Sequence, residues 1–262
     1  MAPPPTFLTE PLTSKVITLI GYYGAGNPGD DCLERQSVSL IKEYAPNATC
    51  HHHQSNHKIL TVFLILKSDT IIFGGGSLFQ DHTSQKSLYY YLALLAIALL
   101  LRKKTILLGH GFSPFQYSLS KKIAAFLLKK THKITVRDKE SFTYCKKLNI
   151  PEHKLHLASD LAYYKATITS CPDQPLVIAS RYHVCVWASL HQIPFLALAY
   201  DDKLINLATV LHQPYIDTRN PYTQHDFQEK VSDLQNKFTH YQNQLKHHVP
   251  RLIQRAENNK LS

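Results

Sequence analysis

Short apolar runs alternate with polar segments along most of the chain, and helical patterns follow many of these runs. Each run has the length of a buried strand and ends at glycines or polar side chains. The predicted strands cover residues 16–20, 69–73, 105–108, 133–136, 154–157, 176–179 and 195–199. This order of strand, polar strand end and helix predicts an α/β fold of parallel sheets with flanking helices.

Helical patterns fill most of the intervals between these runs. They predict helices over residues 32–44, 88–101, 119–130, 141–148, 184–190 and 204–211. The run at 61–66 fits either a strand or a helix, and the histidines 51–53 are expected in a solvated loop. Ser141 is expected to cap the helix that it begins. Apolar residues spaced by three and four predict an amphipathic helix over 227–245, which Pro250 then breaks or kinks.

The longest apolar run is LYYYLALLAIALLL, at residues 88–101. A helix needs about 18 or more such residues to span a bilayer, so this run is too short. We therefore expect a buried core helix. The alternative is a helix on a membrane surface, anchored by its tyrosines and by the basic residues 102–104.

The chain has 262 residues and a formal net charge of +10. That excess reflects either a lysine-rich surface or attraction to an anionic partner, such as a phosphorylated substrate, a membrane face or nucleic acid. Nucleic-acid binding is disfavoured because no known binding signature is present. Five scattered cysteines without a CxxC pair fit a reducing compartment rather than a zinc site. The N-terminus has no signal-peptide pattern, so we expect a cytoplasmic protein. The spacing of the cysteines and histidines leads us to expect no metal site.

One polar loop follows the predicted strand at 69–73. It begins with Gly74, Gly75 and Gly76 and continues with polar side chains to Ser84. Glycine loses the most backbone freedom on folding, so three in a row indicate a sharp turn or a close approach. A strand, a glycine turn, a polar loop and a helix in this order are typical of a ligand-facing loop, and we expect these glycines to contact substrate.

An earlier loop, at residues 24–29, matches the GxGxxG pattern of dinucleotide sites. Asp30 and Asp31 would repel a pyrophosphate at the following helix, and no acidic residue stands about 20 positions later to hold a ribose. The loop is then either a glycine turn with Asp30 or Asp31 as the helix cap, or a contact to another ligand through Asn27.

Basic residues follow three other predicted strands. Arg181 and His183 stand at one strand end, where arginine can bind carboxylate or phosphate oxygens and histidine can donate a proton. Their structural alternative is a surface arginine and a helix-capping histidine. Arg137 could instead pair with Asp138 or Asp160, and Lys203 could neutralise the two aspartates before it.

Six blocks of this sequence, taken together, resemble the polysaccharide pyruvyl transferase family. The blocks stand in family order and cover much of residues 16–211. They are GYYGAGNPGDD (21–31), DTIIFGGGSLFQDHTS (69–84), GHGFSPF (109–115), ITVRDKES (134–141), ASDLAYY (158–164) and VIASRYHVCVWASLHQIPFLALAYDDK (177–203).

The resemblance implies a two-domain, GT-B-like architecture and transfer of the pyruvyl unit of phosphoenolpyruvate to a sugar as a ketal. It implies that Arg137, Arg181 and His183 contact phosphoenolpyruvate, with Lys203 close by. Two arginines and a lysine would complement the carboxylate and phosphate of this donor, and no cofactor is required. His183 is the candidate acid that protonates the methylene carbon.

The resemblance does not decide which residue is the base for the sugar hydroxyl. Asp81 and Asp160 are the two possibilities.

The sequence also departs from the family pattern. Only the 20 residues 161–180 separate the Asp160 block from the Arg-x-His block, where the family has a much longer segment. This predicts a truncated second domain. The expected parts are a leader (1–14), a first Rossmann-like domain (15–165), the truncated second one (166–222) and C-terminal helices (223–262).

The resemblance therefore implies a pyruvyl transferase that acts in the cytoplasm on a sugar of a cell-surface glycan precursor. Its partners would be phosphoenolpyruvate and a sugar or lipid-linked glycan, with peripheral contact at the inner membrane face. One alternative is a catalytically silent relative that retains an anion-binding cleft. Another is a GT-B-like glycosyltransferase that uses a nucleotide sugar.

Overall fold

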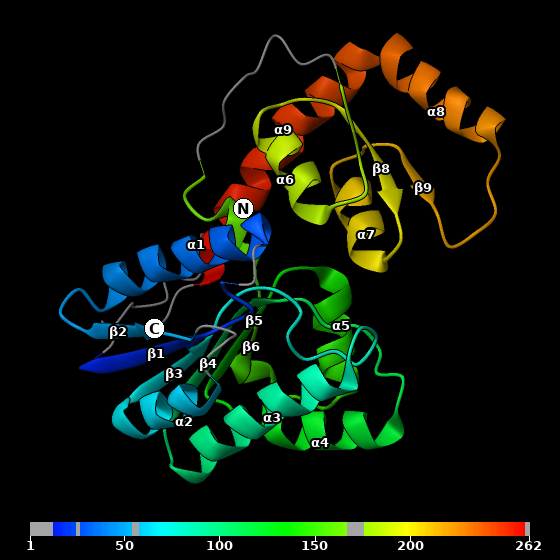
Figure 1. Cartoon of the computed structure of the whole chain (residues 1–262). Coiled ribbons are helices and arrows are strands. Elements are labelled where there is room, and N and C mark those ends of the chain that lie inside the picture. The colour runs from blue at the N-terminus through cyan, green and yellow to red at the C-terminus, as the bar shows by residue number, and fades with distance from the viewer. Residues whose placement is uncertain (1–12, 25–26, 54–57, 167–175, 260–262) are drawn as a thin grey trace. The chain divides into compact units, whose positions relative to one another are not determined.

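The computed structural model describes residues 13–24, 27–53, 58–166 and 176–259 (Figure 1). The chain forms two compact units. The first contains residues up to Leu161 together with the C-terminal segment from Ala256, and the second runs from Ala162 to Arg255. Most of the predicted leader, 1–14, lies outside the described residues. The other domain boundaries expected from the sequence stay predictions.

The first unit is built on a six-stranded, fully parallel sheet with the order β2-β1-β3-β4-β5-β6. The strands β1, β3 and β4 carry mostly apolar, buried side chains, as expected of the inner strands of a parallel sheet that helices cover on both faces. In β3 all four residues are buried. The strands are β1 Val16–Ile20, β2 Thr49–His52, β3 Thr70–Phe73, β4 Lys104–His110, β5 Lys133–Val136 and β6 Leu155–Leu157.

Helices cover the two faces of this sheet unequally. Three helices that follow one another along the chain, α2, α3 and α4, lie together on one face, and α1 lies on the other (Figure 1). The predicted core helix is confirmed, because α3 buries one side that includes Leu88, Leu92 and Leu95. The helices are α1 Pro28–Tyr44, α2 Lys58–Lys67, α3 Gln85–Leu100, α4 Ser118–Leu128 and α5 Lys139–Lys147.

The second unit has a smaller parallel sheet of three strands, in the order β7-β8-β9. Its core contains Leu196 and Ile216 from the sheet and Leu234 from a helix. The small sheet agrees with the shortened second domain that the sequence predicts. The elements are β7 Val177–Ala179, α6 Tyr182–Leu190, β8 Phe195–Ala199, α7 Asp202–Val210, β9 Tyr215–Asp217, α8 Gln224–Asn236 and α9 Phe238–Ala256.

The end of the chain is anchored in the first unit by Asn259. This fully buried side chain donates to the carbonyl of Ser159 at 2.9 Å and accepts from the hydroxyl of Thr135 at 2.6 Å. Thr135 lies in β5, so these bonds tie residues 256–259 to the sheet. Two short 3₁₀ turns, at 152–154 and 161–163, complete the same region.

Several local predictions are wrong. The histidines 51–53 do not form a solvated loop, since β2 pairs with β1 and His53 is buried with its Nδ1 2.6 Å from the hydroxyl of Thr61. Backbone pairing to β1 makes this segment a strand, whereas its side-chain pattern did not predict one.

Asp138, not Ser141, caps α5, because its carboxylate accepts from the Ser141 N–H at 2.7 Å.

The C-terminal apolar pattern belongs to two helices rather than one. The chain leaves helical geometry at Lys237, between α8 and α9, and α9 continues through Pro250. Spacings of three and four survive this break because the buried sides of both helices face the same core. None of the helices in the described ranges combines the length and apolar character required to cross a membrane.

Candidate functional site

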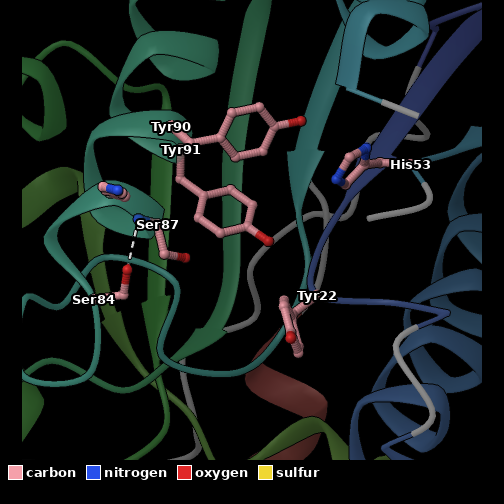
Figure 2. Close-up of a pocket in the computed structure, with 7 residues that line it drawn as sticks. Tyr22, His53, Ser84, Ser87, Tyr90 and Tyr91 are labelled. Carbon is pink, nitrogen blue, oxygen red and sulfur yellow. Dashed lines mark hydrogen bonds between the residues drawn. The ribbon is translucent and has the colours of Figure 1, made fainter. Parts of the chain in front are cut away.

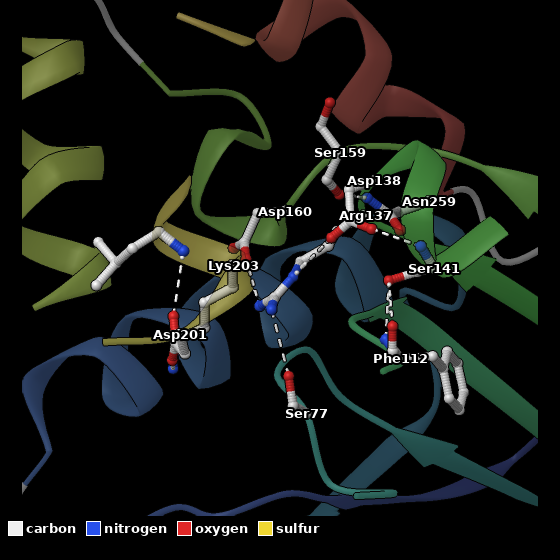
Figure 3. Close-up of polar contacts among 11 residues, drawn as sticks. Ser77, Phe112, Arg137, Asp138, Ser141, Ser159, Asp160, Asp201, Lys203 and Asn259 are labelled. Carbon is white, nitrogen blue, oxygen red and sulfur yellow. Dashed lines mark hydrogen bonds and ion pairs between the residues drawn. The ribbon is translucent and has the colours of Figure 1, made fainter. Parts of the chain in front are cut away.

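Arg137 follows β5 directly, at the carboxyl edge of the six-stranded sheet. Its Nη1 lies 3.3 Å from Asp160, its Nε lies 3.4 Å from Asp138, and its Nη2 donates to the Ser77 hydroxyl at 3.3 Å (Figure 3). Arg137 is 8% exposed and Asp160 is 2% exposed. The structure thus brings together three of the regions that the sequence marked, namely the glycine loop, Arg137 and Asp160.

Gly111 makes room for this arginine. A Cβ at Gly111 would lie 2.5 Å from Nη2 and 2.6 Å from Cζ of Arg137, so no larger residue fits while the guanidinium keeps this position. The Gly111 N–H also donates to the Gly76 carbonyl at 2.9 Å, which joins the ends of β3 and β4. Sequence reasoning did not include Gly111 among the site residues. The available signal was the Gly-His-Gly segment after a predicted strand.

Asp138 and Asp160 fix the guanidinium in different ways. Asp138 divides its two oxygens between the first turn of α5 and Arg137, so it aligns the strand end with the helix start. Asp160 forms a buried ion pair with Arg137. Such a pair is costly to break from one side because the remaining charge stays buried without its partner. Asp160 was expected as a base, and the contact shown here is its pairing with Arg137.

The glycines of the loop after β3 are in tight packing positions. A Cβ at Gly74 would lie 1.8 Å from the Tyr23 hydroxyl oxygen, and a Cβ at Gly75 would lie 3.0 Å from a methyl carbon of Leu161. Gly76 has a φ of +116°, a conformation that side-chain-bearing residues rarely adopt. Burial raises the pKa of Tyr23 well above its ordinary value, so this hydroxyl stays protonated.

Asp81 and Asn27 both bond to helix starts. The two carboxylate oxygens of Asp81 accept the N–H groups of Gln116 and Tyr117, at 2.9 and 3.1 Å, just before α4. Asn27 is the cap of α1 and accepts from the Gly29 N–H at 3.2 Å, so the expected cap at Asp30 or Asp31 is wrong. The proline that follows Asn27 takes the first helical position, which suits a residue without an N–H.

His110 is a buried group that sequence reasoning did not select. It ends β4 and lies against the rings of Phe79 and Phe112. Burial, together with the nearby charge of Arg137, lowers the pKa of His110 to about 3, although a bond to the Leu108 carbonyl opposes this shift. The imidazole is therefore neutral near pH 7 and adds no charge to the surroundings of Arg137.

The second unit places its three predicted site residues at one edge of the small sheet. Arg181 is the exposed cap residue of α6, and the half-buried His183 lies in its first turn. Lys203 lies in the first turn of α7, 3.2 Å from the carboxylate of Asp201. Because β7 and β8 are parallel neighbours, both of these loops follow carboxyl ends at the same edge.

A pocket of about 260 Å³ lies in the first unit, where the ends of β1 and β2 meet the start of α3 (Figure 2). Tyrosines and small hydroxyl side chains dominate its lining. Tyr91 bonds to the Gly21 carbonyl at 3.4 Å, and burial raises its pKa and that of Tyr90. The lining residues are Tyr22, His53, Ser84, Lys86, Ser87, Tyr90 and Tyr91.

Within the described part of the chain, one group of three side chains has metal-ligand spacing. His225, Asp226 and Glu229 are exposed at the start of α8. Asp226 already bonds the Thr223 N–H and hydroxyl, at 2.7 and 2.8 Å, as part of a capping box. The capping box accounts for the position of Asp226, and we assign no metal to this exposed group.

A family model described as polysaccharide pyruvyl transferase matches residues 27–176, which is more than half of the chain. The matched region contains Arg137, Gly111 and Asp160. No curated protein matches the chain significantly in sequence.

Several solved structures match this chain in a structure comparison. HepE from Anabaena, in complex with UDP, has a TM-score of 0.51 and 11% identity, over 94% of this chain and 97% of that chain. A putative UDP-N-acetylglucosamine 2-epimerase from Listeria monocytogenes has a TM-score of 0.41 and 10% identity, over 82% and 71%. UDP-GlcNAc 2-epimerase from Neisseria meningitidis has a TM-score of 0.39 and 9% identity, over 83% and 75%. The likeness to HepE confirms the GT-B-like fold class.

Proposed function

The chain belongs to the polysaccharide pyruvyl transferase family, and from this premise we propose that it transfers the pyruvyl group of phosphoenolpyruvate to a sugar of a cell-surface glycan precursor. The observation that carries the proposal is Arg137, a nearly buried guanidinium fitted against Gly111 at the carboxyl edge of a parallel sheet. Ligands of such sheets bind at this edge. A guanidinium fixed there before the donor arrives is suited to a carboxylate or a phosphate.

The proposed roles follow from the charge of the donor. Arg137, Arg181 and Lys203 offset the negative charge of phosphoenolpyruvate and of the departing phosphate. His183 gives a proton to the methylene carbon, which becomes the methyl group of the ketal. One sugar hydroxyl adds to the neighbouring carbon, the C–O bond to phosphate breaks, and a second hydroxyl adds to the same carbon to close the ketal, its proton passing to the released phosphate.

Asp160 is the more suitable of the two carboxylates considered as the base. Both oxygens of Asp81 accept backbone N–H groups, so its carboxylate has a structural task at the start of α4. Asp160 instead contacts Arg137, the arginine proposed to bind the donor. We propose that Asp160 receives the proton of the attacking hydroxyl.

Release of phosphate from phosphoenolpyruvate in the presence of a β-linked amino-sugar acceptor tests this function. We expect release only with the acceptor present, and strongly reduced release with Arg181→Ala. If no phosphate is released, and Arg181→Ala binds phosphoenolpyruvate as well as the parent protein does, the transferase proposal is wrong.

A catalytically silent relative is the second candidate. The observation that favours it is the pairing of Arg137 with both Asp138 and Asp160, which offsets the positive charge available to an anion. A silent relative would bind phosphoenolpyruvate without releasing phosphate.

A GT-B-like glycosyltransferase is the other alternative. A nucleotide sugar would protect such an enzyme against thermal unfolding, and phosphoenolpyruvate would not.

We propose that the tyrosine-lined pocket of the first unit holds the acceptor sugar. Sugar rings present apolar C–H faces that pack on aromatic rings, while their hydroxyls bond to serine and tyrosine. Tyr22 offers such a ring, since it is 48% exposed in the lining. A lipid-linked acceptor would place the reaction at the cytoplasmic face of a membrane, and this location is part of the proposal.

Tyr22→Ala is expected to raise the KM for the acceptor about twofold to thirteenfold, since an aromatic contact contributes about 0.5–1.5 kcal/mol. The KM for phosphoenolpyruvate should not change. Steady-state kinetics with each substrate varied in turn measures both values. Tyr222→Ala is the matched control, because Tyr222 is 46% exposed and lies in the second unit. Equal acceptor KM values for the parent protein and Tyr22→Ala would contradict the assignment.

A further inference from the structure

The outward sides of α2, α3 and α4 carry large apolar side chains. On a helix that covers a sheet, the side away from the sheet is normally polar. Here the most exposed is Leu100 of α3, at 82%. We call these residues the apolar face: Leu60, Phe63 and Leu66 of α2, Leu100 and Leu101 at the end of α3, and Leu119 and Phe126 of α4.

The three helices that carry the apolar face are packed side by side. α3 lies against both α2 and α4, on one side of the sheet (Figure 1). Lys103, in the turn after α3, donates to the Leu66 carbonyl at 3.0 Å and ties that turn to the end of α2. Tyr89 of α3 and Ser120 of α4 lie 3.3 Å apart through their hydroxyls. The exposed apolar residues therefore belong to one continuous layer of helices.

The charged side chains of α3, α4 and the turns after them are all basic. From Gln85 to Lys130 the chain contains eight lysines and arginines and no aspartate or glutamate. Basic and exposed apolar side chains are in contact in this layer. The Lys130 ammonium lies 4.1 Å from the centre of the Phe126 ring. A long basic side chain can pack its stem on apolar surface and extend its charge to a polar layer.

We propose that the apolar face docks on the surface of a bilayer that contains anionic lipids. Apolar side chains enter the boundary between headgroups and acyl chains, and the lysines and arginines of the same layer contact the negative headgroups. An isologous contact with a second copy of the chain would instead bring the same positive charges together. Exposed apolar residues in this number mark an interaction surface rather than ordinary surface variation.

Docking in this way leaves the candidate active-site loops free. The apolar face covers one flank of the six-stranded sheet, whereas Arg137 and the glycine loops lie at the carboxyl edge of its strands. The protein would rest on the membrane without crossing it. The inference concerns binding to lipid and does not rest on the proposed transferase activity.

Flotation of the full chain with lipid vesicles tests the proposal. We expect flotation with vesicles of phosphatidylcholine mixed with phosphatidylglycerol, little with phosphatidylcholine alone, and weaker binding at high salt. Leu100→Ser combined with Phe126→Ser removes apolar contact, and Lys122→Glu combined with Lys130→Glu reverses two charges. Each pair should lower binding to the anionic vesicles more than tenfold.

Matched controls come from the second unit. Val210→Ser with Tyr222→Ser changes two exposed apolar residues, and Lys230→Glu with Lys246→Glu reverses two exposed charges. These variants should float like the parent protein, and thermal unfolding should show that all variants are folded. The proposal is overturned if the parent protein does not float, if the face variants bind as well as the controls, or if the face variants only disrupt a dimer of the chain.

Discussion

Arg137→Ala is expected to lower kcat/KM for phosphoenolpyruvate about 10²–10³-fold and to destabilise the protein by about 3 kcal/mol. The kinetic loss is that of a fixed cation aimed at the charge of the donor. The loss of stability arises because Asp160 is 2% exposed and would keep a buried charge without its arginine. Steady-state kinetics and urea unfolding measure the two effects.

A second substitution separates these effects. Adding Asp160→Asn to Arg137→Ala removes the uncompensated carboxylate, so we expect most of the lost stability to return. The double variant should still bind phosphoenolpyruvate as weakly as Arg137→Ala, because the guanidinium is missing in both. If Arg137→Ala binds phosphoenolpyruvate like the parent protein, Arg137 is only a structural ion-pair partner.

Gly74→Ala is expected to destabilise the protein by about 3 kcal/mol or more. The new methyl group would lie 1.8 Å from the hydroxyl oxygen of Tyr23, a side chain that is 1% exposed and packed in the core. Tyr23→Phe in the same chain removes that oxygen and leaves the nearest ring carbon 3.1 Å from the methyl. The double variant should therefore recover most of the stability, as measured by urea unfolding.

Gly21→Ala provides the matched control for this cycle. Its methyl would lie 2.2 Å from Cζ and 2.5 Å from another ring carbon of Tyr23, so removing the hydroxyl does not remove the clash. Tyr23→Phe should rescue Gly74→Ala and not Gly21→Ala. Equal rescue of both, or of neither, would show that the hydroxyl does not determine why position 74 is glycine.

The sequence predicted those parts of the fold that depend on local composition. The strands at 133–136 and 195–199 have the predicted bounds, because the polar segments on both sides of each apolar run show where the strand begins and ends. The short strand β9 was missed, since Tyr215-Ile-Asp217 is too brief to form a pattern. The strand β2 was missed because its histidines and cysteine take strand geometry only through pairing with β1.

The charged residues of the candidate site could be predicted from the sequence, but the contacts between their side chains could not. Arg137 and Asp160 follow strand ends, so their types and positions can be read from the chain. That the guanidinium lies flat against Gly111 depends on the distance between β4 and β5, which no local pattern records. Likewise, Asp81 and Asn27 look like site residues in sequence, and their bonds to backbone N–H groups beside α4 and in α1 become visible only in the folded chain.

Mass spectrometry of the acceptor after incubation with phosphoenolpyruvate distinguishes pyruvyl transfer from the alternatives. We expect an amino-sugar acceptor to gain the mass of pyruvate less one water, with phosphate released in equal amount, and Arg137→Ala and Arg181→Ala to form far less product. An acceptor of unchanged mass with every sugar tested, or a gain in mass that requires a nucleotide sugar in place of phosphoenolpyruvate, would contradict pyruvyl transfer.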